Sequence, residues 1–473
     1  MSQETILNLS KKEESKKTGL ISKETLLSLL ENGSIDTVNL AICDMQGRLM
    51  GKRLTAAYCL ENNLDKGTHF CNYLLGTDFE MNTPDGYEMM NWENGYGDWL
   101  ALPDWSTLRI VPWADRTAIV FCDVYDEKTG EPIPIAPRTL LKNQIEKAAA
   151  KGFELNMASE LEFYLFKESF EDLHQKGYED VETAGHINED YNLLQGTRNE
   201  PFYQKIRRNM AKANIPIESS KGEAFKGQHE INMRYSDALN AADNHIMFKH
   251  GMKEMCMQDN LSVTFMAKPN HQWTGSSGHI HLSLWDKRAG ENVFYDPDGG
   301  TYNMSETMQH FLAGVLKYSR DFALFFAPYV NSYKRYAQES WAPVNIIWSH
   351  DNRSSGYRIV GDGKSLRMET RIPGADMNPY LAYTALIGAG LQGIEERLEL
   401  EPEFKGNAYK DKNIPRIPGS LYEAIQCWED SEVVKKVLGE KAASHYLFTA
   451  KLEQKQFDRI VTKWERQRYF EQC

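Results

Sequence analysis

Acidic, imidazole and guanidinium side chains recur at four places in this chain, in spacings that suit chemistry on a phosphate group. The four segments are Glu160–Glu162, Glu223–Glu230, His279–His281 and Arg367–Arg371. Their glutamates and histidines are side chains that hold divalent metal ions, and their arginines are donors that hold phosphate. Together they predict a site that binds metal ions and a phosphate group.

The first two glutamates lie in strand-like sequence. Glu160 and Glu162 lead into the apolar run 163–166, and the period of two in a strand places both carboxylates on one face. Carboxylates held side by side share either a proton or a cation, and the acids elsewhere in the chain favour the cation. For this motif alone, an amphipathic strand with a solvated acidic face is the alternative.

The remaining acids and histidines flank a turn and a second strand. Glu223 and Glu230 lie on either side of Gly227, which permits a tight backbone path that turns both carboxylates toward one point. Considered alone, this segment is also a plain charged loop. His279 and His281 alternate in a strand-like run, so both rings point the same way, although a structural role is the alternative for the pair by itself.

The order of these motifs resembles that of the glutamine synthetase family. The shared patterns are Glu-x-Glu, Glu-x3-Gly-Gln-x-Glu, Gly-x-His-x-His-x-Ser, Asn-Arg-Ser and Arg-x-Glu-x-Arg-x-Pro. The resemblance continues through segments 331–335, 342–343, 352–354 and 378–381, and it covers about residues 36 to 473.

The resemblance implies two metal sites. One ion would be held by Glu162, Glu223 and Glu230, and the other by Glu160, His279 and Glu369. This set is rich in oxygen donors and suits Mg²⁺ or Mn²⁺, since a zinc site more typically contains cysteine or a third histidine.

The resemblance also implies that the substrates are ATP and glutamate. Glutamate would lie near Arg335, Arg371 and the loop at Gly275, beside the metal ligands Glu162 and Glu223. ATP would be bound by His281, Ser283, Lys364 and Arg367, while Arg353 and Arg358 would stabilise the phosphoryl group during transfer. The implied enzyme is an ATP-dependent carbon–nitrogen ligase. In it the γ-carboxylate of glutamate attacks ATP, and an amine then displaces phosphate from γ-glutamyl phosphate.

Two departures from the family pattern predict an amine other than ammonia. Cys71 and Asn72 follow Phe70 where ammonia-using members carry Asp, and Trp341 stands where they carry Glu, whereas Asp98 still matches a third acidic group. Loss of the carboxylates and gain of aromatic surface favour an aromatic amine such as aniline. The alternatives are an alkylamine, ethanolamine or polyamine ligase, an ordinary ammonia-using glutamine synthetase, and an inactive structural relative.

The expected architecture is an α+β fold. After a polar tail (1–20), the resemblance implies a small β-grasp-like domain (21–132) and a catalytic domain (133–473) with a guanido-kinase-like antiparallel sheet. It also implies a homo-oligomer of hexameric rings, stacked as a dodecamer, with active sites between subunits. Sequence pattern predicts a capped helix at 22–32 and strands at 39–44 and 115–123.

Composition is compatible with a globular enzyme. A net charge of −13 over 473 residues, without clustered Lys or Arg, argues against nucleic acid or an anionic membrane as a partner. The polar start, the scattered seven cysteines and the absence of a long apolar run predict a cytoplasmic protein.

Three further motifs are interpreted as structural or unmodified. Gly388–Gly393 matches a dinucleotide fingerprint but lies in a helical run, so we expect helix packing through small residues. The stripe of Met252, Met255 and Cys256 is expected in the core. Modification of Tyr409 is not predicted.

Overall fold

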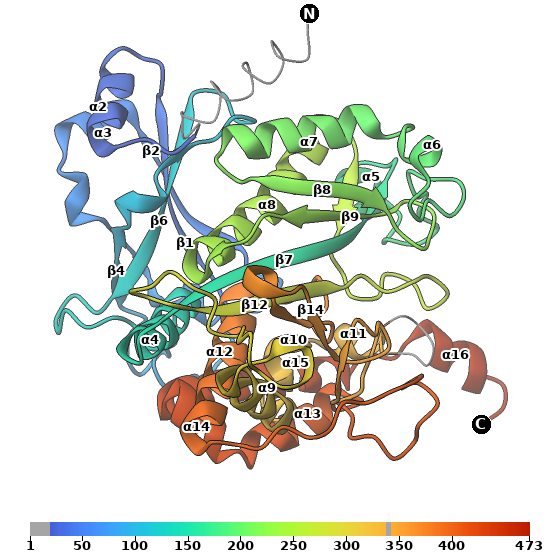
Figure 1. The fold of residues 1–473 in the computed structure, drawn as a ribbon. Helices are drawn as coiled ribbons and strands as arrows, with labels where there is room; N and C mark the ends of the chain where they lie inside the picture. Colours follow the sequence, from blue (N-terminus) through green and yellow to red (C-terminus); the bar gives the residue numbers. More distant parts are fainter. Residues whose placement is uncertain (1–18, 337–341) are drawn as a thin grey trace, which may run out of the picture. The chain divides into compact units, whose positions relative to one another are not determined.

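The computed structural model describes residues 19–336 and 342–473. The chain divides into two compact units. The first comprises Met1–Met81, Trp92–Thr139 and Ala158–Thr264, and the second comprises Asn82–Asn91, Leu140–Met157 and Phe265–Cys473. Both contain helices and strands (Figure 1), so the fold is α+β as expected. Of the expected polar tail, only residues 19 and 20 are among those described.

The N-terminal part of the first unit is a sheet of short strands with two helices. Its main elements are α2 (Lys23–Glu31), β1 (Thr37–Cys43), β2 (Leu49–Thr55), α3 (Ala56–Glu61), β3 (Thr68–Cys71), β4 (Asp98–Pro103), β5 (Arg109–Ile110) and β6 (Thr117–Tyr125). The strand order is β2-β1-β6-β4-β3, with β5 paired to β6. β1 and β6 run parallel, and the other pairs are antiparallel.

Local sequence accounts for these N-terminal elements. Ser22 caps α2, because its side chain accepts the N–H of Thr25 at 3.2 Å, and the helix ends before Asn32. The capped helix predicted at 22–32 is therefore confirmed. β1 and β6 confirm the two predicted strands with shifted ends, and β6 is buried at its first six positions, which makes it the centre of this core.

The rest of the first unit carries a second set of strands. Its elements are β8 (Ile217–Gly222), β9 (Gln228–Met233), β10 (Ser236–Asp237), β11 (Ser262–Thr264), α5 (Phe170–Gln175), α6 (Leu193–Gly196), α7 (Glu200–Lys212) and α8 (Ala238–Gln258). α4 (Pro137–Ala150) and β7 (Phe153–Phe166) contribute residues to both units. In α8, Met252, Met255 and Cys256 are each fully buried, which confirms their expected place in the core.

The second unit combines four strands with a group of helices. The strands β12 (Gly278–Asp286), β13 (Trp348–His350), β14 (Tyr357–Val360) and β15 (Arg367–Thr370) are ordered β13-β14-β15-β12. The helices are α9 (Glu306–Tyr318), α10 (Ala323–Phe326), α11 (Val330–Tyr333), α12 (Pro379–Glu396), α13 (Leu421–Glu429), α14 (Glu432–Leu438), α15 (Glu440–Phe457) and α16 (Lys463–Tyr469). β15 is antiparallel to both β12 and β14.

α12 is the buried centre of the helical part. All its residues from Pro379 to Gly393 are buried, as expected for a helix that is apolar on every side. The predicted glycine motif lies inside this helix, where a Cβ on Gly393 would approach Gly314 Cα of α9 to 2.6 Å. Gly388–Gly393 therefore serves helix packing, as predicted, and not a nucleotide loop.

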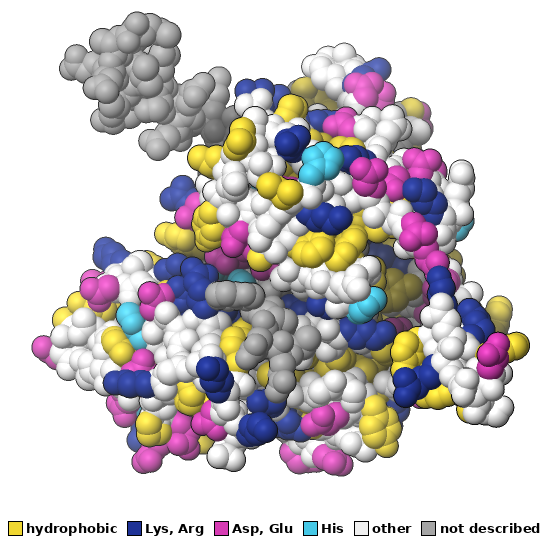
Figure 2. All heavy atoms as spheres, turned by 90° about the vertical axis from the view of Figure 1, so that its right-hand side faces the viewer, with side chains coloured by type: hydrophobic (Ala, Val, Ile, Leu, Met, Phe, Trp, Pro, Cys, Tyr) yellow, Lys and Arg dark blue, Asp and Glu magenta, His cyan; other side chains and the backbone are white. Residues whose placement is uncertain are grey.

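On the face shown in Figure 2, Lys and Arg side chains are scattered among Asp and Glu and do not form one field. Among the described residues, none of the helices has both the length and the apolar character that a membrane span requires.

Candidate active site

Three of the predicted metal ligands meet in the first unit. One oxygen from each of Glu162, Glu223 and Glu230 lies within 4.8 Å of the others. Pairing of β7 with β9 places Glu162 directly opposite Glu230, and Glu223 follows the end of β8. The period of two in a strand predicts the face of β7 on which Glu162 lies, whereas the register of β9 decides that Glu230 is the acid opposite it.

Gly227 makes the turn that brings Glu223 and Glu230 together. Its φ is +71°, and a Cβ there would lie 2.6 Å from the Cβ of Thr183. No side chain fits this position without displacing a neighbour, and the backbone conformation is one that glycine adopts easily. The tight backbone path predicted from the sequence is present.

The cluster concentrates negative charge that a cation would neutralise. Burial, together with the nearby carboxylates of Glu160, Glu223 and Glu162, raises the pKa of Glu230 to about 9. Lys221 lies opposite Glu230 on β8 and bonds to Glu223, with its Nζ 3.7 Å from Glu230 Oε1. One ammonium cannot offset four carboxylates, so this set of oxygen donors fits a divalent ion such as Mg²⁺ or Mn²⁺.

A second group of predicted ligands lies in the second unit. β12 and β15 pair with His281 opposite Glu369, which brings His279 Nδ1 to 3.5 Å from Glu369 Oε1. Both His279 and Glu369 are buried. Glu160, the remaining member of the predicted set, is on β7 in the first unit.

Glu369 also anchors two predicted arginines. Arg358 Nη1 donates to Glu369 Oε2 at 2.9 Å, and Arg371 Nη1 donates to Glu369 Oε1 at 2.7 Å. Arg358 also pairs with Asp351, because Arg358 Nε donates to Asp351 Oδ1 at 3.1 Å. This hydrogen bonding and the positive charge of Arg358 lower the pKa of Asp351. Arg353 lies exposed in the turn after β13.

Asp351 is a residue that the sequence interpretation missed. It directly precedes the Asn352-Arg353-Ser354 motif, and an acid beside a phosphate-binding motif was the available sign. Held between Asp351 and Glu369, the Arg358 guanidinium has a defined orientation, which a long exposed arginine lacks.

Three of the residues predicted for glutamate, Arg335, Arg371 and Gly275, lie near one another in the second unit. Arg335 is 1% exposed and donates to the carbonyls of Ile372 and Arg371 at 2.9 and 3.0 Å. A Cβ on Gly275 would lie 2.6 Å from Arg335 Cγ, so the glycine permits this close approach. Arg335 thereby fixes the end of β15, next to Arg371.

The residues predicted for ATP lie on and around two neighbouring strands. Arg367 Nε donates to His281 Nδ1 at 3.1 Å across the β12–β15 pair. Ser283 lies two residues further along β12, and its hydroxyl accepts a hydrogen bond from Trp285 Nε1 at 2.9 Å. Lys364 is exposed in the turn before β15.

Three of the predicted amine-pocket and catalytic residues meet at one end of the N-terminal sheet. Cys71 pairs with Asp98 where β3 and β4 adjoin, and the N–H of Asn72 donates to the carbonyl of Gly97 at 3.0 Å. Asp98 is exposed and Asn72 is buried. Trp341 lies outside the described residues.

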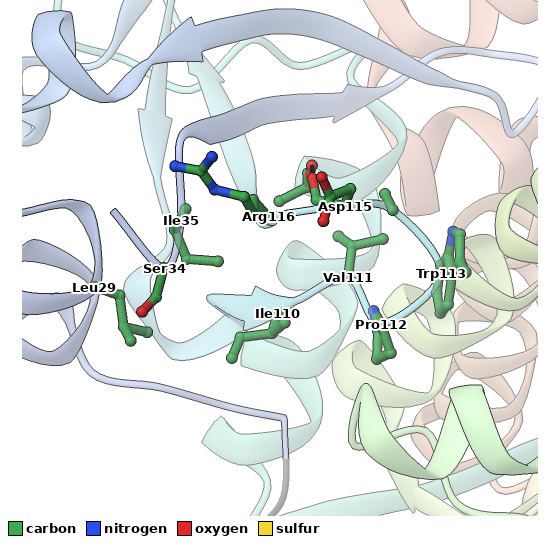
Figure 3. A pocket seen from close by; sticks show the side chains of 11 residues that line it. Leu29, Ser34, Ile35, Ile110, Val111, Pro112, Trp113, Asp115 and Arg116 are labelled. Atoms are coloured by element: carbon green, nitrogen blue, oxygen red, sulfur yellow. Dashed lines mark hydrogen bonds between the residues drawn. The ribbon is translucent and has the colours of Figure 1, made fainter. Parts of the chain in front are cut away.

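A cavity of about 350 Å³ lies elsewhere in the first unit. Figure 3 shows it between α2 and the β5–β6 connection, lined by Leu29, Ile35, Ile110 and Val111 with Asp115 and Arg116 at its side. None of the predicted site residues lines it, so the site is defined by its charged groups and not by this cavity.

Comparison with known proteins decides the family. Residues 134–469 match the family model of the glutamine synthetase catalytic domain. The chain belongs to the glutamine synthetase family. The glutamine synthetase family members to which it is similar include the γ-glutamylethanolamide synthetase GlnA4 of Streptomyces coelicolor, with 45% identity over 96% of this chain and 97% of that protein. The glutamate–isopropylamine ligase of a Pseudomonas species is 39% identical over 93% of this chain and 96% of its own length.

The fold agrees with this membership. The solved structure of GmaS without ligand superposes with a TM-score of 0.82 at 28% identity, covering 95% of this chain and 99% of that one. The predicted fold class is confirmed, and so is the predicted enzyme class. This glutamine synthetase family member is an ATP-dependent carbon–nitrogen ligase.

Proposed function

We propose that this enzyme joins the γ-carboxylate of L-glutamate to a small organic primary amine, with γ-glutamyl phosphate as the intermediate. The observation that carries the proposal is the contrast between two regions. The acidic cluster at Glu162, Glu223 and Glu230 is complete, whereas Cys71 and Asn72 stand where an ammonia-using enzyme carries an acid. The residues proposed to activate glutamate are present, whereas the acid with which an ammonia-using enzyme binds ammonium is replaced.

Divalent ions, when bound, would offset the negative charge on the phosphate oxygens of ATP. We assign one ion to Glu162, Glu223 and Glu230, and a second to Glu160, His279 and Glu369. These side chains present oxygen and imidazole donors from buried or half-buried positions, which keeps them oriented before the ion arrives.

The chain's own residues position the reactants. Arg358, held by Asp351 and Glu369, and Arg353 stabilise the phosphoryl group as it leaves ATP for the glutamate carboxylate. Arg371, Arg335 and the loop at Gly275 orient glutamate. His281, Ser283, Lys364 and Arg367 bind the nucleotide. Phosphoryl transfer depends on this positioning and not on a protein nucleophile.

The amine is proposed to enter beside Cys71, Asn72 and Trp341, with the carboxylate of Asp98 as the base that accepts its proton. An aryl amine such as aniline suits the apolar substitutions, and a short alkylamine suits them as well. The relatives named for ethanolamide and isopropylamine support the alkyl class. An ammonia-using enzyme and an inactive structural protein are the other candidates. The presence of all six proposed metal ligands argues against the inactive one.

The test is ATP- and glutamate-dependent phosphate release with ammonium, ethanolamine, putrescine, isopropylamine and aniline. We expect an organic amine to exceed ammonium in kcat/KM. Glu369→Ala should abolish phosphate release with every amine, while Glu399→Ala, at an exposed position, should leave it unchanged. Preference for ammonium would contradict the proposed amine class.

A further inference from the structure

Lys221 brings a positive charge into the acidic cluster of the first unit. β8 and β9 pair with Lys221 directly opposite Glu230, and Lys221 Nζ lies 3.7 Å from Glu230 Oε1. The same ammonium donates to Glu223, two residues further along the chain. Lys221 therefore pairs with two of the three carboxylates whose oxygens converge within 4.8 Å of one another.

Packing keeps this ammonium in the cluster. The N–H of Tyr191 donates to the carbonyl of Gly222 at 3.3 Å, and a Cβ on Gly222 would lie 2.5 Å from Glu189 Cβ. Segment 189–191 thus lies directly against the end of β8. The centroid of the Tyr191 ring is 4.7 Å from Lys221 Nζ, a distance at which an aromatic face attracts a cation. With 21% of its side chain exposed, Lys221 is held by carboxylates and a ring together.

The ammonium and a divalent ion would compete for the same oxygens. Gln228 Nε2 also donates to Glu162, at 3.2 Å, but a neutral amide supplies no charge to the cluster. Lys221 supplies one positive charge, and Mg²⁺ or Mn²⁺ would supply two. Positive charges a few ångströms apart repel each other, so the cluster cannot hold the ammonium and the ion together without a cost.

We propose that Lys221 is a resident cation of the metal site, which binds Glu223 and Glu230 in the metal-free enzyme and leaves them when a divalent ion binds. The inference rests on the metal assignment made within the proposed function. Lys221 then has two opposite effects. It stabilises the metal-free fold, because it offsets part of the repulsion among buried carboxylates. It lowers the affinity for the ion, because its two ion pairs must break first.

The sign of one change separates this role from a simpler one. If Lys221 only oriented the carboxylates for the ion, its removal would weaken metal binding, since the ligands would lose their positions. If Lys221 is a resident cation, its removal strengthens metal binding and weakens the metal-free protein. Both quantities are measured without turnover.

The experiment titrates Mn²⁺ into the full-length, nucleotide-free enzyme by calorimetry. Lys221→Met removes the charge and keeps a long apolar side chain, and we expect it to bind Mn²⁺ about tenfold more tightly than the wild type. Lys221→Arg keeps the charge and should stay closer to the wild type than to Lys221→Met. In EDTA, the melting temperature of Lys221→Met should lie below that of the wild type, and saturating Mn²⁺ should remove this difference.

Lys226→Met is the matched control. Lys226 is an exposed lysine in the turn between Glu223 and Glu230, and its loss should change the Mn²⁺ affinity by less than about twofold. If Lys221→Met does not fold, Lys221→Gln gives the same comparison, because its amide also carries no charge.

The outcomes distinguish this inference from the proposed function. Unchanged or weaker Mn²⁺ binding by the uncharged variant overturns the inference and leaves the proposed function standing. If the wild-type enzyme binds neither Mn²⁺ nor Mg²⁺, the metal assignment and this inference fail together. A preference for ammonium in phosphate release contradicts the proposed amine class alone, since the resident cation acts on the ion and not on the amine.

Discussion

Burial and neighbouring charge both act strongly on Glu230, one of the proposed metal ligands. In the metal-free protein its pKa is about 9, because burial and the neighbouring Glu160, Glu223 and Glu162 disfavour its charged form. The folded protein thus retains a proton on Glu230 at pH values where the unfolded chain has released it. Stability therefore falls as pH rises above the ordinary value of 4.5, and the loss is complete above about 9.

The substitution Glu230→Gln should remove this dependence of stability on pH. In EDTA, we expect the melting temperature of the variant to fall less than that of the wild type between pH 6 and pH 9, since the amide has no proton to release. It should also bind Mn²⁺ more than about tenfold more weakly, because a negatively charged carboxylate ligand is replaced by a neutral amide. Thermal unfolding and calorimetric titration with Mn²⁺ measure the two effects. Glu218→Gln, at an exposed glutamate on β8, is the matched control. Equal slopes of melting temperature against pH in Glu230→Gln and Glu218→Gln would contradict this account.

At the scale of elements, the approach of α12 to α9 depends on glycines at their crossing. A Cβ on Gly393 would lie 2.2 Å from the carbonyl oxygen of His310, and one on Gly314 would lie 2.4 Å from the carbonyl oxygen of Ala389. Backbone atoms cannot move aside as a flexible side chain can. The two helices would have to separate, which would disturb the packing of a buried helix.

We therefore expect Gly393→Ala to destabilise the protein by roughly 1–3 kcal/mol through overpacking. Urea unfolding followed by far-UV circular dichroism measures the change. Gly196→Ala in α6 is the control, since a Cβ there meets nothing within 4 Å. A variant at Gly393 as stable as the one at Gly196 would show that the helices repack without cost.

At the scale of the whole molecule, the assembly into rings that the sequence resemblance implies would make each active site depend on two subunits. In that arrangement, Asp98 would act on the site of a neighbouring subunit whose own Glu369 holds the metal. Two inactive variants should then complement each other, because a symmetric interface repeats the same pair of surfaces around the ring.

Mixing Asp98→Asn with Glu369→Ala tests this dependence. After co-expression in equal amounts, random assembly should restore roughly a quarter of the sites to wild-type composition. Phosphate release with the preferred amine measures the recovery, and native mass spectrometry reports the subunit number. If the co-expressed pair stays as inactive as the separate variants, the subunits do not share their sites.

Much of the site followed from local sequence, because local rules act over a few residues. The period of two in a strand placed Glu160 and Glu162, the need for a tight turn singled out Gly227, and Ser22 marked the start of α2. The resemblance to a family then assigned roles to residues that no local rule connects.

Tertiary structure alone decided the contacts between distant segments. Strand register sets Lys221 opposite Glu230, and the turn after β13 sets Asp351 against Arg358. The pairing of β3 with β4 brings Asn72 beside Gly97. Sequence determined which residue types were available and which faces of local elements they occupy. Their partners depended on the register and packing of segments far apart in the chain, where a shift of one residue exchanges every neighbour.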